Sequence, residues 1–141
     1  MLIGISPLLG PDLLHTMRAM GHGDEIALVD GNYPAAEHAR RLIRADGIHL
    51  LPMLRAMLKL FPVEAAYRAS LNNDPAQRGV IHHALDDLAT TSAQGFTMTP
   101  LAGEQLYPRI RSAYAIIATS EPELFANVIL RKAALPPSAT E

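Results

Sequence analysis

A single histidine stands between two glycines in the run Gly21-His22-Gly23. Glycine has no side chain and leaves the backbone free to turn, so these neighbours expose the imidazole of His22 without crowding it. Because imidazole titrates near neutral pH, an exposed ring can take up or release a proton during a reaction. The sequence therefore predicts His22 as a candidate acid/base catalyst, the alternative being an exposed histidine at an ordinary helix-to-strand junction.

Asp30 closes an apolar segment, residues 25–30, which is typical of a strand buried on both faces. Open α/β sheets bind ligands at the carboxyl ends of their strands, and a carboxylate accepts hydrogen bonds from hydroxyl groups. We therefore predict that Asp30 binds a hydroxylated ligand, the alternative being a turn-forming aspartate before Gly31. At ~3.3 Å per residue, His22 and Asp30 lie ~20 Å apart along this strand. One small ligand reaches both only if residues 21–24 fold back over the sheet or a neighbouring subunit completes the site.

Two further histidines precede two aspartates by one helical turn, in His82-His83 and Asp86-Asp87. This spacing could place a histidine and an aspartate on one helix face as metal ligands. No third ligand is evident, so we predict a solvent-exposed helix face and no metal site. The sequence also has no glycine-rich dinucleotide fingerprint and no Gly-x-Ser-x-Gly nucleophile turn, which disfavours nucleotide cofactors and serine hydrolase chemistry.

Helix and strand patterns alternate along the chain and predict an α/β fold. Helices are expected over residues 11–20, 50–60, 74–91 (with Asp74 as N-cap and Pro75 in the first turn) and 101–111. Strands are expected at residues 25–30, 63–67, 96–99, 114–119 and 127–131, whereas residues 35–44 leave helix and strand open. We predict one domain, residues 1–132, with a central, mostly parallel sheet flanked by helices in three Rossmann-like layers, followed by a mobile tail, residues 133–141.

Composition narrows the classes of partner. Twelve Lys and Arg against fourteen Asp and Glu give a formal charge of −2, so neither nucleic acid nor an anionic membrane surface is an expected partner. No stretch reaches the ~18 apolar residues of a membrane-spanning helix, and the first residues do not resemble an export signal. The absence of cysteine fits a reducing compartment, so we expect a cytoplasmic protein. A chain that is 49% hydrophobic with only seven Phe and Tyr favours a homo-oligomer.

Motifs at both ends of the chain resemble one known family. Ile5-Ser6-Pro7-Leu8-Leu9, Met20-Gly21-His22-Gly23-Asp24-Glu25-Ile26 and Asp30 followed by Tyr33-Pro34 are similar to the L-fucose mutarotase and D-ribose pyranase family. Residues 43–47 resemble its fucose branch, and the likeness continues at residues 106–107, 113–119 and 127–132. It covers nearly the whole chain and is weakest between residues 63 and 98.

The resemblance implies an isomerase that interconverts the α and β anomers of L-fucose, or of a related sugar, without a cofactor or metal. It also implies a ring-like homo-oligomer, often a decamer. On the matching positions, His22 is the catalytic histidine, Asp30 and Asn127 contact the sugar, and Tyr107 corresponds to a tyrosine of the fucose branch. Opening the sugar ring requires removal of the anomeric hydroxyl proton and protonation of the ring oxygen, and His22 could supply either step.

Two positions depart from the family's pattern. Phe125 stands where a tyrosine is usual, and its ring can stack on a sugar but offers no hydroxyl. Gly103 stands where an arginine or histidine is usual, and Arg111 shares a helix face with Gly103 and Tyr107, so we hypothesise that Arg111 replaces part of that contact. The alternative for Arg111 is a solvated or interface arginine. Two other functions stay open. One is a D-ribose pyranase, because a small residue such as Ala126 is more typical of the ribose branch of the family, and the other is a non-catalytic sugar-binding module.

Overall fold

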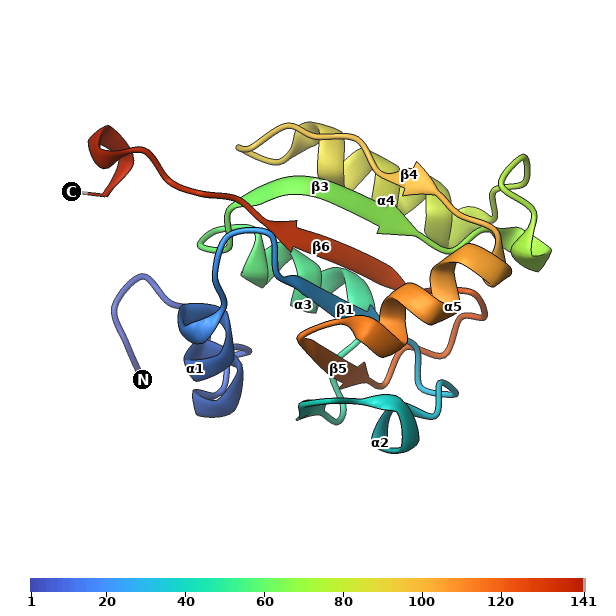
Figure 1. Cartoon of the computed structure of the whole chain (residues 1–141), viewed down its shortest axis with the longest axis horizontal. Helices are drawn as coiled ribbons and strands as arrows, with labels where there is room; N and C mark the ends of the chain where they lie inside the picture. Colours follow the sequence, from blue (N-terminus) through green and yellow to red (C-terminus); the bar gives the residue numbers. More distant parts are fainter. Residues whose placement is uncertain (141) are drawn as a thin grey trace.

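A six-stranded mixed sheet forms the centre of the molecule, with the strand order β2-β5-β1-β6-β3-β4 (Figure 1). The computed structural model describes residues 1–140. All neighbouring strands are parallel except the pairs that β6 forms with β1 and β3, so β6 alone runs against the others. The strands are β1 (Glu25–Val29), β2 (Leu42–Ala45), β3 (Val63–Arg68), β4 (Thr99–Pro100), β5 (Ala115–Thr119) and β6 (Val128–Lys132).

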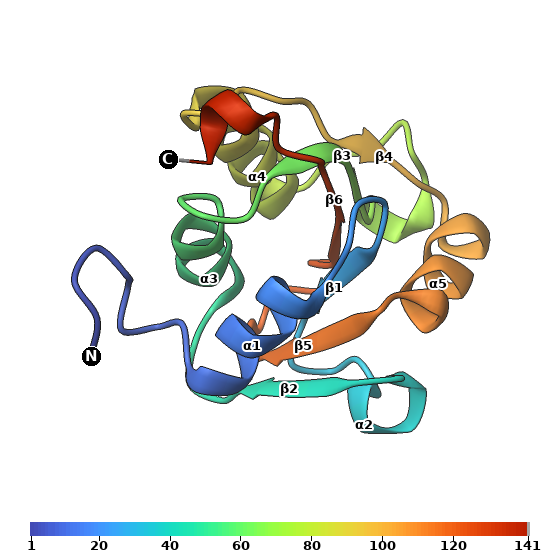
Figure 2. The same cartoon turned by 60° about the vertical axis from the view of Figure 1, so that its left-hand side comes forward.

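Helices cover both faces of the sheet (Figure 2). One face carries α1 (Pro11–Ala19), α3 (Leu50–Met57) and α4 (Val80–Thr91), and the other carries α2 (Ala35–His38) and α5 (Gly103–Ser112). Short 3-10 turns, η1 (Leu71–Asn73) and η2 (Pro137–Ala139), complete the elements. The structure confirms the predicted α/β class with a mostly parallel sheet between helical layers.

The alternation of side chains along β1 explains why its sequence is apolar from Ile26 to Val29. Ile26 and Leu28 belong to the core beneath α1, α3 and α4, whereas Ala27 and Val29 belong to the core beneath α5. All four are fully buried. Successive side chains of a strand point to opposite faces, so a strand covered on both sides favours apolar residues at consecutive positions. The same reasoning accounts for β5, which is buried at every position.

The connection from β5 to β6 crosses the carboxyl end of β1. β5 and β6 lie on either side of β1. β5 ends at this edge of the sheet and β6 begins there, so residues 120–127 arch over the end of β1. The arch lies close to the turn that follows β1, because the amide of Gly31 donates to the carbonyl of Glu121 over 2.8 Å. A Cβ on Gly31 would come within 3.2 Å of that carbonyl oxygen, which explains a glycine here. This arch positions the candidate site.

The predicted start of the third helix is wrong by several residues. Asp74 does not cap a helix: its Oδ1 accepts from the amide of Ala76 and its carbonyl accepts from the amide of Gln77, which closes a turn around Pro75. The helix α4 begins only after Gly79, whose amide donates to Nδ1 of His82. Asp-Pro favours a turn as readily as a helix N-terminus, and here the turn prevails.

The strand expected at residues 96–99 is also shorter than predicted. The amide of Phe96 bonds to the carbonyl of Ala89 at the end of α4, so this part of the chain follows the helix and only Thr99 and Pro100 pair with β3. Proline has no amide proton, which suits its place on the edge strand. Residues 35–44, left open above, contain both α2 and β2. The last strand ends at Lys132, and of the predicted mobile tail residues 137–139 form a turn while Glu141 lies outside the described residues.

No helix within residues 1–140 combines the length and the apolar character that crossing a bilayer requires.

Candidate active site

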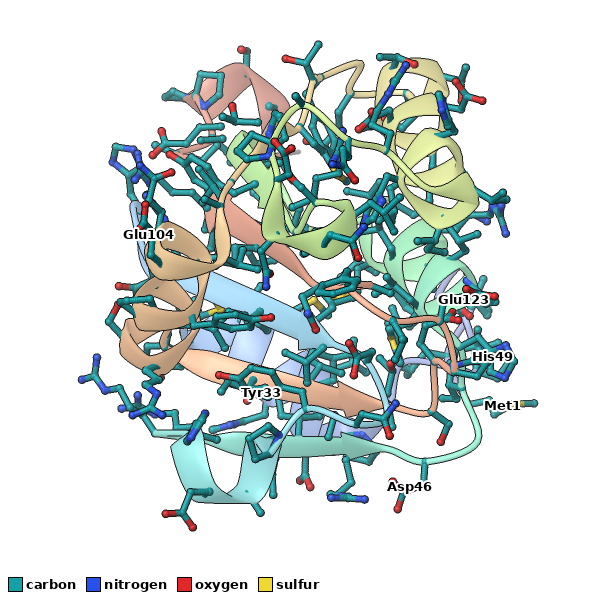
Figure 3. The ribbon with its side chains drawn as sticks, turned by 90° about the vertical axis from the view of Figure 1, so that its right-hand side faces the viewer. Met1, Tyr33, Asp46, His49, Glu104 and Glu123 are labelled. Atoms are coloured by element: carbon teal, nitrogen blue, oxygen red, sulfur yellow. The ribbon has the colours of Figure 1, made fainter. Side chains whose placement is uncertain are left out.

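A cleft of about 450 Å³ opens at the carboxyl edge of the sheet, between α2, α5 and the arch of residues 120–127. Clefts of this size hold small organic ligands. Figure 3 faces this edge and shows Tyr33 in front of the strands, between α2 and α5. The lining is mainly aromatic with a few polar groups and consists of Asp30, Asn32, Tyr33, Pro34, His38, Tyr107, Arg111, Leu124, Phe125 and Asn127.

Asp30 forms the floor of the cleft and is 7% exposed. Its Oδ1 accepts a hydrogen bond from the amide of Asn32 over 2.9 Å. Burial raises the pKa of the Asp30 carboxyl above its ordinary value, although hydrogen bonds from the backbone of Asn32, Tyr33 and Ala126 and from the side chain of Asn127 act in the opposite direction. A buried carboxyl held in one orientation is well suited to accept hydrogen bonds from ligand hydroxyls.

Asn127 is locked beside Asp30 at the start of β6. Its Oδ1 accepts from the amide of Asp30 over 3.0 Å, so the orientation of the side-chain amide is set and its NH₂ group is the end that can donate. Asn127 is 2% exposed. The structure therefore places Asp30 and Asn127, two of the predicted site residues, side by side in one cleft.

Phe125 forms a wall of the cleft from a strained position. Its backbone has φ of 58°, in the left-handed region that non-glycine residues rarely adopt. Nε2 of His82 donates to the carbonyl of Phe125 over 2.9 Å, which ties the arch to α4. The arch is also fixed at Glu121, whose carboxylate accepts from the amides of Leu50, over 3.1 Å at the start of α3, and Glu123.

The prediction that His82 lies on a solvent-exposed helix face is wrong. The side chain is fully buried, and because Nδ1 accepts from Gly79 while Nε2 donates to Phe125, the ring is neutral. Burial lowers the pKa of His82, which agrees with this state. Asp86 binds Arg68 over 2.7 Å and Arg78 over 3.0 Å and is thus an ion-pair partner. Within residues 1–140 no group of three or more His, Cys, Asp or Glu is arranged to hold a metal ion.

The aromatic side of the cleft is formed by Tyr33 and Tyr107, whose rings stack at 6.3 Å between centroids. Arg111 does line the cleft, but its Nη2 contacts Nε2 of His38 over 2.9 Å, and Nδ1 of His38 contacts the hydroxyl of Tyr33 over 2.9 Å. The hypothesis that Arg111 replaces a contact missing at Gly103 stays a prediction, since the contact with His38 engages one of the five donors of the guanidinium.

The space beside Gly103 belongs to Asn73 instead. A Cβ on Gly103 would lie 2.9 Å from the side-chain carbon and oxygen of Asn73 and 3.0 Å from the ring of Tyr107. The hydroxyl of Tyr107 points to Oδ1 of Asn73 over 3.4 Å. A polar group therefore does stand at this position, and it comes from η1 rather than from α5. The sequence showed no periodicity that would bring residue 73 here.

His22 lies at the opposite end of β1 and takes no part in the cleft of its own chain. Its side chain is 60% exposed, and its Nε2 meets Oε2 of Glu64 over 2.8 Å. Residues 21–24 do not fold back over the sheet, because Gly23 and Asp24 pair with Lys132 at the end of β6. Of the six predicted site residues, the structure brings five together: Asp30, Tyr107, Arg111, Phe125 and Asn127.

Tyr33 and His38 were missed as site residues. Tyr33 was noted only as part of an aromatic-proline motif, and His38 lies on a helix of four residues, too short to show any periodicity. The position of Tyr33 three residues after Asp30 was the available signal, because a turn following a strand end returns its side chains to the same edge of the sheet.

Comparison with known proteins identifies relatives over almost the full chain. The chain is 39% identical to the L-fucose mutarotase of Haemophilus influenzae, with 96% of this chain and 99% of that protein covered. It is 34% identical to the fucose mutarotase of Homo sapiens, covering 94% and 93%. The crystal structure of the Streptococcus pneumoniae fucose mutarotase in complex with L-fucose superposes with a TM-score of 0.79, at 34% identity, over 96% of this chain and all of that one.

The sequence model of the RbsD / FucU transport protein family matches residues 3–135. This match spans every strand of the sheet and all residues of the cleft. The chain therefore belongs to the RbsD / FucU transport protein family.

Proposed function

We propose that the protein is an isomerase, a mutarotase that interconverts the α and β anomers of L-fucose or a closely related monosaccharide. The observation that carries this proposal is the cleft that joins a buried carboxyl, an oriented amide and aromatic rings, in a chain related to fucose mutarotases over its whole length. Sugars present hydroxyl groups at their edges and C–H bonds on their faces, and this set of groups complements both.

In the proposed complex, Asp30 accepts hydrogen bonds from sugar hydroxyls and the amide NH₂ of Asn127 donates one. The rings of Tyr107 and Phe125 lie against the sugar's C–H face and limit its rotation. Each neutral hydrogen bond of this kind contributes ~1 kcal/mol, and those to an ionised carboxylate ~1.5–3 kcal/mol. Holding the ring in one orientation also raises the chance that the anomeric centre meets the acid/base group.

His22 supplies the proton transfer from a second copy of the chain. The carboxylate of Glu64 can only accept a hydrogen bond, so Nε2 of His22 carries the proton in this pair, and in the tautomer that is protonated at Nε2 alone Nδ1 is left to accept one. Nδ1 takes the proton of the anomeric hydroxyl as the ring opens, and water or a neighbouring hydroxyl relays a proton from the imidazole to the ring oxygen, so that no net proton is gained or lost. The reverse transfer closes the ring on the other face of the aldehyde. A positioned acid/base group of this kind contributes ~10²–10⁴-fold.

The shared site requires a homo-oligomer, for which we propose the ring-shaped decamer that the family resemblance implies. The support within one chain is the separation of His22 and Asp30, which lie beyond opposite ends of β1; at ~3.3 Å per residue it is ~20 Å, which a single sugar does not span. A cytoplasmic location remains a prediction from the composition.

Saturation-transfer NMR between the anomeric protons of L-fucose tests the function. The wild-type protein should accelerate the exchange, and His22→Ala should bind the sugar but lose the acceleration. His15→Ala is the matched control, because His15 is an exposed histidine on α1, away from the cleft. Binding of L-fucose by the wild-type protein with no faster exchange would refute the mutarotase and leave a sugar-binding module; the same experiment with D-ribose detects pyranase activity.

Mixing two inactive variants tests the shared site. His22→Ala and Asp30→Ala each damage a different half, so random mixed oligomers contain some sites in which both residues are intact. If each site takes one half from each of two subunits, about a quarter of the wild-type activity returns on mixing. Activity that stays at the level of the single variants would contradict a site shared between subunits.

A further inference from the structure

Two hydrogen bonds link three cleft residues from three parts of the chain. Arg111 on α5 approaches Nε2 of His38 on α2, and Nδ1 of His38 approaches the hydroxyl of Tyr33, each over 2.9 Å. The ring of Tyr33 contacts two further rings, that of His38 in a T-shaped arrangement at 5.3 Å between centroids and the stacked ring of Tyr107. The position of the Tyr33 hydroxyl is thereby fixed before any ligand arrives.

The chemistry of the three groups sets the direction of both hydrogen bonds. A guanidinium has donors only, so Nε2 of His38 must be the acceptor and carries no proton. The neutral ring then has its proton on Nδ1, and Nδ1 donates to the oxygen of Tyr33. The proton of the Tyr33 hydroxyl cannot lie along the same line, so it turns away from His38.

The environment also keeps the proton of Tyr33 in place. Burial raises the pKa of Tyr33, and the nearby hydroxyl of Tyr107 adds to this effect, while the charge of Arg111 opposes it. Tyr33 is therefore a neutral phenol at physiological pH. With its oxygen engaged by His38, what it offers to a ligand in the cleft is a donor.

We propose that Tyr33 contacts the substrate as a hydrogen-bond donor, and that His38 and Arg111 are positioning residues that aim its proton into the cleft. This inference rests on the proposed function and deepens it, because it assigns a specificity-determining residue. The site should prefer sugars that present an acceptor oxygen, a hydroxyl or the ring oxygen, toward Tyr33. A sugar with hydrogen in place of that oxygen would leave the Tyr33 proton without a partner, which costs affinity.

Equilibrium titration of L-fucose by NMR or calorimetry gives the first test, since it is independent of turnover. Tyr33→Phe keeps the stacked ring and removes the hydroxyl, and it should weaken binding about three- to tenfold, the value of one neutral hydrogen bond. Tyr114→Phe is the matched control, because Tyr114 precedes β5 beneath Arg41, at the opposite end of that strand from the cleft. Equal affinities of the wild-type protein and Tyr33→Phe would overturn the proposal.

A series of monodeoxy and deoxyfluoro derivatives of L-fucose identifies the acceptor. For the derivative that lacks the oxygen facing Tyr33, the wild-type protein and Tyr33→Phe should bind equally. Fluorine accepts a hydrogen bond but cannot donate one, so the fluoro derivative at that position should retain part of the preference for the wild-type protein. If the series locates the position and the fluoro derivative retains none, Tyr33 acts as an acceptor and the inference is wrong.

The role of His38 is tested by a double-mutant cycle. His38→Asn keeps a donor near the position of Nδ1 and should retain more affinity than His38→Leu, which keeps none. In a Tyr33→Phe background, His38→Leu should cause no further loss, because there is no hydroxyl proton left to aim. Independent losses would show that His38 acts in another way and would overturn the positioning role.

The failure of this inference is distinguishable from the failure of the proposed function. A wild-type protein that neither binds L-fucose nor speeds its anomer exchange refutes both. A wild-type protein that binds and converts the sugar, with Tyr33→Phe unchanged in affinity, refutes the role of Tyr33 alone.

Discussion

Replacing His82 by leucine should loosen the cleft from the far side of the sheet. The buried imidazole accepts from the amide of Gly79 and donates to the carbonyl of Phe125, and leucine can do neither. A buried carbonyl without a partner costs ~1–3 kcal/mol, and the loss of the bond at Gly79, a half-buried helix start where water can replace the imidazole, adds ~0.5–1 kcal/mol. We therefore expect His82→Leu to lower the free energy of unfolding by about 2–3 kcal/mol.

Urea unfolding at 25 °C and pH 7.5 measures this loss. With a slope of ~1–3 kcal/mol per molar urea, the midpoint should fall by about 0.7–3 M. His83→Leu is the matched control, because the neighbouring ring is exposed and surface substitutions change stability by ~0.5 kcal/mol or less. His82→Asn, which keeps an acceptor for Gly79 but no donor for Phe125, should fall between the two.

The same variants should also differ in sugar binding and in the pH dependence of their stability. Without its anchor, the left-handed Phe125 can relax, so L-fucose affinity should fall in His82→Leu but not in His83→Leu. The folded pKa of His82 is lowered, so the unfolded chain binds protons more readily, and wild-type stability should decrease as pH falls through about 6.5. His82→Leu should show a weaker decrease. Equal midpoints for His82→Leu and His83→Leu would refute the reasoning.

Three further substitutions have definite expected outcomes. Asp30→Asn should abolish sugar binding yet raise stability at pH 7, because the raised folded pKa makes ionised Asp30 destabilising as pH rises; thermal unfolding should show the gain vanish at acidic pH. Gly103→Ala should displace the side chain of Asn73 and crowd the ring of Tyr107 in the cleft wall, and so weaken sugar binding a few-fold in a titration with little change in melting temperature. Glu64→Ala should reduce kcat for anomer exchange while KM is unchanged, because Glu64 orients the ring of His22; a change in KM alone would contradict this.

The central strands could be predicted from the sequence because burial on both faces requires a recognisable pattern of residues. Residues 25–29 and 115–119 are covered on both faces, and a run of apolar residues between turns is the result. The direction of β6 has no corresponding pattern in the sequence. A buried strand has the same composition whether it runs with its neighbours or against them, so the antiparallel pairing with β1 came only from the structure.

The candidate site was predictable where its residues follow a strand end or share a helix face. Asp30 belongs to the first kind and Arg111 to the second, whereas Tyr107 and Asn127 were indicated only by the family resemblance. The separation of His22 from Asp30 also followed from the length of one strand. Asn73 and His38 were out of reach, because η1 and α2 are single turns whose position depends on tertiary packing rather than on local pattern.

Changes in the arch of residues 120–127 can alter the pKa of Asp30 without changing the strands of the sheet. Burial raises the pKa of Asp30, and hydrogen bonds from Ala126 and Asn127 in this segment lower it, so the segment takes part in setting how firmly the carboxyl holds a proton. The segment lies between β5 and β6, so its length can change while the register of β1, β5 and β6 stays as it is. Variation among relatives in this one connection could thus shift the pH range of the site and leave the scaffold intact.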